Sequence, residues 1–518
     1  MKTLQSIFKG RLAPYFAGVI SVFYFLAIGF RGFSESSLQW LSRSAEMGEQ
    51  LRDSPRNISE WSPETHGLAD VFAAIVYAYV PGIAEWVLFG LCVLFGALAT
   101  GLVFSLTQRL AGAIGGWMAL FFLLSTAPWM GLFTRVDPTF LLVPVMLGFF
   151  LAWYAPTLSW WKRSLWCTPL LATGVLLWPG FAIIAGLVLI VELLCAPHRT
   201  EAESQGLVDG PTITVDRLLI PLGGLLLLLL YPLFWSEPLD GLIQYFLGAL
   251  EQPAAEFVFR GDAYPPARPP LYTGAAWIFE QLPLAVVFAF TCGILWCFVD
   301  LRAPNRRLAI ACAVVAAALL TFPVLFRSPR PLGAEFGVLF MATGLPVAVL
   351  LLCRFFSHAL GQGAPSKTVR RVAIVTFLLA GTSILIETPR AVESPESFRS
   401  PMTARLVGWS ASGDMPMRED ILPLALLDSI DDPAETTYLY SAGWEEYLER
   451  YRKMRLLRGI ETTPDPERAD VAIRRVPPVA AGRFSVYTAP HIPPLEDSST
   501  EVVPDIHRPL FLIDRRAE

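Results

Sequence analysis

Two acidic residues stand beside long apolar segments, at positions where a carboxylate could take a proton from an attacking hydroxyl group. Glu35 lies a few residues beyond the first apolar run, and Asp137 lies just before a later one, close to Arg135. A carboxylate at such an edge is costly unless it is hydrated or paired, so both are candidate site residues. A structural role is the alternative for each. Glu35 could belong to the first turn of a solvated helix start that Ser34 or Ser36 caps. Asp137 could pair with Arg135 or cap the following helix.

Other polar residues near apolar segments could bind an anionic group. A guanidinium group can hold a phosphate through two parallel N–H donors, and candidates are Arg260, Arg268, Arg327 and Arg330. For each arginine alone, solvation near lipid headgroups is the simpler explanation. His66 opens a short apolar segment, where a lone histidine is more often structural than catalytic.

The composition is that of a membrane protein. Of 518 residues, 54% are hydrophobic and 16% are charged, with a net charge of −5. A soluble domain is typically about 25% charged. No basic patch is interleaved with aromatic residues, which excludes nucleic-acid binding.

The seven cysteines all lie within or at the edges of apolar runs. The long polar segments therefore have no disulfide, cysteine metal cluster or thiol nucleophile of their own.

The apolar runs predict about eleven membrane-spanning helices, because a helix needs roughly 20 apolar residues to cross the hydrocarbon layer. They are Leu12–Phe30, Trp86–Leu106, Ala111–Pro128, Thr139–Tyr154, Leu165–Leu177, Gly180–Leu194, Leu218–Phe234, Leu282–Val299, Leu308–Phe326, Phe336–Cys353 and Val372–Ile386. The fifth and sixth meet at Trp178-Pro179-Gly180, a predicted tight turn. They could instead form one broken helix, which would change the parity of the count.

The distribution of Lys and Arg predicts the orientation of these spans. Short connections on one side are rich in basic residues, which favours the cytoplasm for that side and for the N-terminus. The first apolar run is too long for a usual signal peptide and is expected to be a retained anchor. Residues 31–67, 235–281 and those after 387 are then extracytoplasmic, and Leu68–Pro81 is expected to form an interfacial helix. A bacterial inner (plasma) membrane suits this pattern.

The composition changes near Pro389, where a small soluble domain is predicted. Strands are expected at Thr437–Tyr440, Ala469–Ile473 and Phe484–Tyr487, and an amphipathic helix at Trp444–Leu457. The predicted fold is therefore an all-α polytopic membrane domain over residues 1–388, followed by an extracytoplasmic α/β domain over 389–518.

Several short motifs follow one another along the chain. They are Ser34-Glu35 with the polar and aromatic residues that follow to Arg43, His66-Gly67, Arg135-Val136-Asp137-Pro138, Phe259-Arg260-Gly261, Pro270-Leu271-Tyr272, and Arg330–Glu335 followed by Leu345-Pro346. This order resembles the GT-C glycosyltransferases, in particular the branch of protein O-mannosyltransferases and lipid A aminoarabinose transferases. Four positions depart from the family pattern. Ser34 replaces the aspartate of an Asp-Glu pair, His66 lacks the prolines that usually follow it, and Trp178-Pro179-Gly180 replaces Lys-x-Pro. No clear counterpart of the family's arginine precedes Leu345-Pro346.

The resemblance implies a membrane glycosyltransferase with a GT-C-like fold. Such an enzyme transfers a sugar, with inversion, from a polyprenyl-phosphate donor to an extracytoplasmic lipid, protein or polysaccharide acceptor. The resemblance also implies that Glu35 and Asp137 act in catalysis. Glu35 would be the base. Asp137 would position the acceptor or a cation, or share the role of base. The substrate-binding residues that the resemblance implies are Arg135, His66, Arg260, Tyr272, Arg327 and Arg330. No cofactor is certain, and a divalent cation, Mg or Mn, is an optional one.

Two alternatives stay open. A lipid-linked sugar transporter or flippase would place ionisable residues in mid-span and show inverted repeats, and the sequence has neither. A non-catalytic GT-C-like assembly protein would keep the fold and lose part of the site, as the replacement at Ser34 would allow.

Overall fold

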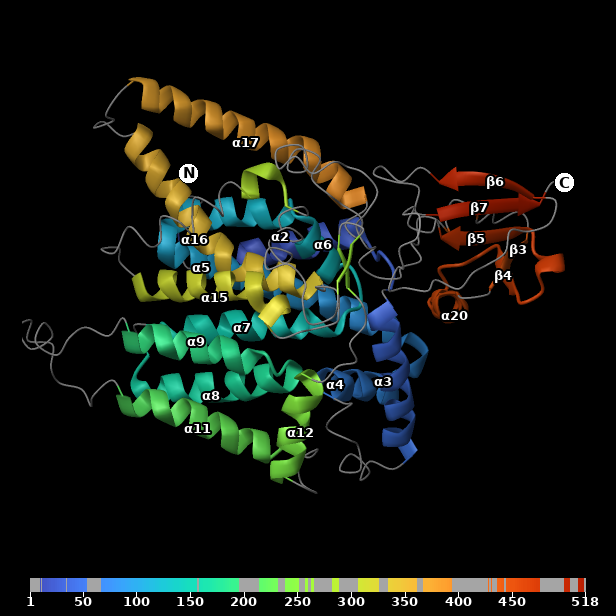
Figure 1. Ribbon diagram of the computed structural model, residues 1–518, viewed down its shortest axis with the longest axis horizontal. Coiled ribbons are helices and arrows are strands. Elements are labelled where there is room, and N and C mark those ends of the chain that lie inside the picture. The colour runs from blue at the N-terminus through green and yellow to red at the C-terminus, as the bar shows by residue number, and fades with distance from the viewer. Residues whose placement is uncertain are drawn as a thin grey trace, which may run out of the picture.

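The computed structural model describes residues 10, 12–33, 35–53, 67–155, 158–194, 214–231, 238–250, 257–259, 262–264, 282–287, 306–325, 334–360, 367–393, 427, 430, 436–441, 444–475, 498–503 and 511–516. Helices make up most of this part of the chain, and a small sheet lies at one side of them (Figure 1).

The helices largely follow the predicted spans. They are α2 (Ala13–Ile28), α3 (Glu35–Asp53), α4 (Leu68–Tyr79), η2 (Pro81–Ile83), α5 (Ala84–Leu124), α6 (Ala127–Phe133), η3 (Pro138–Leu141), α7 (Leu142–Trp153), α8 (Trp160–Leu177), α9 (Phe181–Leu194), α11 (Thr214–Leu229), α12 (Pro238–Leu250), α15 (Arg306–Leu325), α16 (Ala334–Leu360), α17 (Lys367–Glu393), α20 (Glu445–Lys453) and η5 (Pro466–Arg468). Most of the predicted span Leu282–Val299 lies outside the described residues.

Helix α5 is a helical hairpin and covers two predicted spans. Gly112 has φ 78° and ψ −177°, a backbone region that is essentially restricted to glycine. The Phe104 and Trp117 rings lie 5.1 Å apart between centroids. In an unbroken helix these residues would be separated by about 20 Å along the axis. The chain therefore folds back at Gly112 into arms 84–111 and 113–124.

Two ranges of the described helices are long and apolar enough to cross a membrane, Pro81–Leu124 and Gly337–Arg354. Helix α6 and the η3–α7 segment, bent by 103° at a short break, would add a third. Shorter apolar helices are Ala13–Ile28, Leu68–Tyr79, Phe181–Leu194, Leu219–Leu229 and Arg307–Thr321. The count of about eleven spans stays a prediction.

Helices α8 and α9 are separate and lie side by side in Figure 1. The Phe181 amide donates to the Trp178 carbonyl at 2.9 Å, and the Phe181 ring packs on Gly174. The predicted turn at Trp178-Pro179-Gly180 is therefore present, and the alternative of one broken helix is wrong.

Residues 31–67, predicted as a polar loop, contain the 19-residue helix α3. Leu38, Trp40 and Leu41 are buried on it, because α3 packs on the interfacial helix α4. A Cβ atom at Gly48 would lie 2.7 Å from the Tyr77 Cβ, so the absence of a side chain there permits the close approach. Because α3 is rich in polar residues, its apolar face was not predicted from the sequence.

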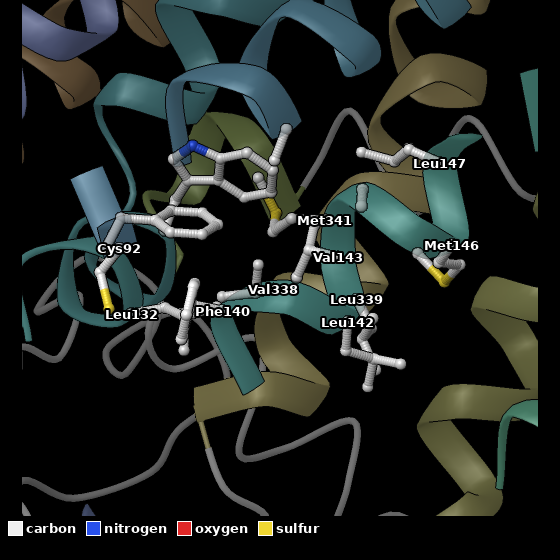
Figure 2. Close-up of a cluster of buried hydrophobic side chains, with 14 of the residues drawn as sticks. Cys92, Leu132, Phe140, Leu142, Val143, Met146, Leu147, Val338, Leu339 and Met341 are labelled. Atoms are coloured by element: carbon white, nitrogen blue, oxygen red, sulfur yellow. The ribbon is translucent and has the colours of Figure 1, made fainter. Parts of the chain in front are cut away.

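The core of the bundle anchors the segment that follows Asp137. Phe140 of η3 and Val143 of α7 are fully buried and lie in one cluster with Cys92 of α5 and with Val338 and Met341 of α16 (Figure 2). This packing holds η3 rigidly at its end of the bundle.

The described residues between 436 and 516, referred to here as the C-terminal domain, carry a mixed five-stranded sheet in the order β4-β3-β5-β7-β6. Its strands are β3 (Thr437–Tyr440), β4 (Ile460–Thr463), β5 (Val471–Arg475), β6 (Ser498–Val503) and β7 (Phe511–Arg516). Strand β3 is parallel to β4 and β5, whereas β7 is antiparallel to both β5 and β6. The predictions of β3, α20 and β5 are confirmed, and β4, β6 and β7 were missed. The predicted strand Phe484–Tyr487 lies outside the described residues. A hairpin of β1 (Phe257–Phe259) and β2 (Asp262–Tyr264) was also missed.

Candidate functional site

Asp137 lies at the bend between α6 and η3 and caps η3. The residue is 8% exposed. Its Oδ1 accepts a hydrogen bond from the Thr139 amide at 2.8 Å and another from the Thr139 hydroxyl. No described residue donates to Oδ2. The cap predicted as the structural alternative is therefore present, and it uses only one of the two carboxylate oxygens.

The sequence forms this bend for local reasons. Pro138 is the first residue of η3 and suits a helix start, because proline has no amide hydrogen to satisfy there. On the other side of the bend, the Thr134 hydroxyl donates to the Met130 carbonyl at 2.7 Å and closes α6.

Two arginines accompany Asp137 at the bend. Arg135 is 6% exposed and is two residues away in the chain. The Arg31 amide donates to the Thr134 carbonyl at 3.0 Å, which brings the end of the first apolar helix to the same bend. Arg31 was missed as a site residue. Its only signal in the sequence was its position as the first basic residue after that helix.

Glu35 is the first residue of α3, as the predicted cap arrangement required. Its side chain is not among the described ones, and neither is Ser34. The other predicted binding residues, His66, Arg260, Tyr272, Arg327 and Arg330, also lie outside the described residues. Their roles stay predictions.

A second buried acid, Asp70, lies in the first turn of α4. Its Oδ2 accepts from the Gly67 amide at 2.9 Å, and its Oδ1 lies 3.7 Å from Nη2 of Arg43. Nearby, the Tyr245 hydroxyl donates to the Val175 carbonyl at 2.9 Å, and burial raises the pKa of this phenol. Asp70 was missed, although a single acid in an apolar interfacial helix was its signal.

A third buried acid, Glu85, starts α5 and binds the C-terminal domain. Its Oε1 accepts from the Tyr77 hydroxyl at 3.0 Å and from Arg450 Nη1 at 3.0 Å. Burial raises the pKa of Tyr77, Glu85 adds to this shift and Arg450 opposes it, so the phenol keeps the proton that it donates.

Among the described residues, no group of three or more His, Cys, Asp or Glu side chains could hold a metal ion. The optional divalent cation therefore gains no ligand set from this part of the chain.

Comparisons with known proteins bear on the fold. No family model matches the chain, and no curated protein matches it. A crystal structure of ArnT from Cupriavidus metallidurans bound to undecaprenyl phosphate aligns with 97% of both chains, at 15% identity and a TM-score of 0.48. An oligosaccharyltransferase from Archaeoglobus fulgidus, tethered to an acceptor peptide, aligns with 90% of this chain and 65% of its own, at 15% identity and a TM-score of 0.46. Both are GT-C fold glycosyltransferases, the family that the motif order resembles.

Proposed function

We propose that this protein is a membrane glycosyltransferase that moves a sugar from a polyprenyl-phosphate donor to an acceptor outside the cytoplasm. The observation that carries the proposal is the bend at Asp137. A buried carboxylate lies there beside Arg135, with one oxygen that no residue in the described part of the chain binds, and the backbone of Arg31 is bonded to the same bend. One acid and two cations at the predicted outer mouth suit a hydroxyl nucleophile and a phosphate leaving group.

The proposed reaction is one inverting displacement. An oxygen of the acceptor hydroxyl forms a bond to the anomeric carbon as the bond from that carbon to the phosphate oxygen breaks. Glu35 takes the hydroxyl proton, and Asp137 positions the acceptor through Oδ2. The polyprenyl phosphate leaves as an anion with the electron pair of the broken bond, so it needs no proton.

Positively charged side chains beside the leaving phosphate would stabilise the negative charge that develops on it in the transition state. Arg31 and Arg135 are the described candidates for this role. Arg260, Arg327 and Arg330 are the predicted ones, and His66 and Tyr272 are proposed to contact the donor. The donor lipid would lie among the helices of an integral protein of a bacterial inner membrane, with the C-terminal domain on the outer side.

Two alternatives give different outcomes in the same assay. A transporter would bind a lipid-linked sugar and move it without forming a new glycosidic bond. A non-catalytic relative, favoured by the replacement at Ser34, would also form no bond.

A transfer assay tests the proposal. Purified protein is incubated with a panel of radiolabelled polyprenyl-phosphate sugars and a crude envelope fraction as the acceptor. We expect label to move to the acceptor with the wild type and to stay on the donor with Glu35→Gln. Absence of transfer from every donor, together with absence of donor binding, would refute the proposal.

A further inference from the structure

Arg450 of the C-terminal domain contacts three helices of the bundle at once. Its Nη1 donates to the Tyr77 hydroxyl on α4 at 2.8 Å and to Glu85 Oε1 on α5 at 3.0 Å. Its Nη2 donates to the Ser42 hydroxyl on α3 at 2.9 Å. The planar guanidinium can reach these partners together because its donors are arranged in a rigid fork.

The contact is a buried one. The side chains of Arg450 and Glu85 are only 8% and 6% exposed. Charges removed from water are tolerated when they are paired and hydrogen-bonded, and losing one partner leaves the other uncompensated. The two partners therefore favour one arrangement of the domain on the bundle. The Ser42 hydroxyl also donates to Glu446, one turn earlier on α20, which extends the contact along α3.

The next residue, Tyr451, reaches the segment that leads into α3. It is fully buried, and its ring stacks on Phe33 with centroids 5.5 Å apart and an interplanar angle of 28°. The Phe33 amide donates to the Tyr451 hydroxyl at 3.4 Å. Phe33 lies midway between Arg31 and Glu35, one proposed phosphate contact and the proposed base.

We propose that Arg450 and Tyr451 are positioning residues, through which the C-terminal domain holds the Arg31–Glu35 segment in the arrangement that sugar transfer requires. This inference rests on the proposed function. It assigns the domain a part in catalysis without a direct contact between the domain and the reacting atoms.

The test compares Arg450→Gln with Lys453→Gln in the purified full-length protein. Lys453 lies on the same helix and pairs with Glu449 at 2.8 Å, but both side chains are more than half exposed, at 58% and 65%. One readout is amide hydrogen exchange of residues 31–37. The other is kcat and the donor KM in the transfer assay.

We expect Arg450→Gln to speed exchange in residues 31–37 and to lower kcat about 10²-fold with an unchanged donor KM, as a misplaced catalytic group does. Lys453→Gln should change neither readout. Arg450→Lys, which keeps the charge but cannot serve both sets of partners, should restore part of kcat. If Arg450→Gln does not fold, Tyr451→Phe replaces it. That variant keeps the ring and loses the hydroxyl, so a smaller change of the same kind is expected.

Unchanged exchange in residues 31–37, or faster exchange with an unchanged kcat, would overturn the inference and leave the proposed function intact. A wild-type protein that transfers no sugar would overturn the proposed function, and the inference with it, whatever the exchange data show.

Discussion

Three buried acids at the end of the bundle beside the C-terminal domain stand at helix starts. Asp70 is in the first turn of α4, Glu85 is the second residue of α5, and Asp137 caps η3. The unpaired amide groups at a helix start carry partial positive charge, which offsets part of the cost of burying a carboxylate. Glu85 and Asp70 also face the cations Arg450 and Arg43. Asp137 combines burial with an oxygen that no described residue binds, which is why we propose it as the acid that positions the acceptor.

The pair of Glu85 and Arg450 permits a prediction about stability. Glu85→Gln alone and Arg450→Gln alone should each lower the free energy of unfolding by about 3–5 kcal/mol, because each leaves one buried charge unpaired. The double variant should lose much less than the sum of the two. The measurement is denaturant unfolding in detergent micelles. Additive losses would mean that the two side chains do not interact as the structure has them.

At the scale of single residues, the sequence predicted part of the candidate site. Arg135 and Asp137 were predicted because polar residues are rare beside apolar runs. Arg31 was missed because its link to the bend is a backbone hydrogen bond to Thr134, which no side-chain pattern reports. Glu85 and Arg450 are 365 positions apart in the chain, and a single sequence does not predict which distant residues pair.

Among the elements, the hairpin of α5 depends on one backbone conformation. Gly112→Ala should lower the free energy of unfolding by about 1–3 kcal/mol, because a residue with a Cβ is strained at that φ and ψ. Gly90→Ala is the matched control. Gly90 lies within the same helix, and no atom lies within 4 Å of the Cβ that the substitution would add. Its effect should be neutral or slightly stabilising. Equal losses in both variants would contradict the fold-back at Gly112.

The elements were predicted unevenly, for physical reasons. An apolar run in hydrocarbon has to be helical, since no water is present to bind free backbone groups. The apolar run that forms α2 was therefore predicted as a helix from the sequence. The 19-residue extent of helix α3 was missed because its apolar residues are spaced among charges, and its burial depends on α4. Strands β6 and β7 lie in the Pro-rich tail, and their pairing with β5 is a tertiary property that local propensity does not reveal.

For the whole molecule, the two ends of the bundle differ in their charged contacts. At one end, Glu85 pairs with Arg450 of the C-terminal domain at 3.0 Å. At the other, Arg307 pairs with the buried Glu192 at 2.8 Å, and Arg109 donates to the Leu151 carbonyl at 3.1 Å. Basic residues at that end suit the cytoplasmic side of a membrane.

This difference predicts the labelling of introduced cysteines. Glu449→Cys on α20 should react with a membrane-impermeant maleimide in intact spheroplasts. Lys162→Cys, which is exposed at the start of α8, should react only after the membrane is permeabilised. The protein without an introduced cysteine measures the background from its seven natural ones. The reverse pattern would mean that the predicted orientation is wrong.

The most direct test of the proposed transfer compares Asp137→Asn with Asp465→Asn. Asp465 also precedes a proline and caps a short 3₁₀ helix, with its Oδ1 accepting from the Glu467 amide at 3.0 Å, but it lies in the C-terminal domain. Asparagine caps a helix about as well as aspartate, so both variants should fold. We predict that Asp137→Asn loses sugar transfer at least about 10²-fold, in the range expected for a catalytic proton-transfer network, while Asp465→Asn keeps the wild-type rate. Equal rates in the two variants, with active wild-type protein, would contradict the role of Asp137 and the site built around it.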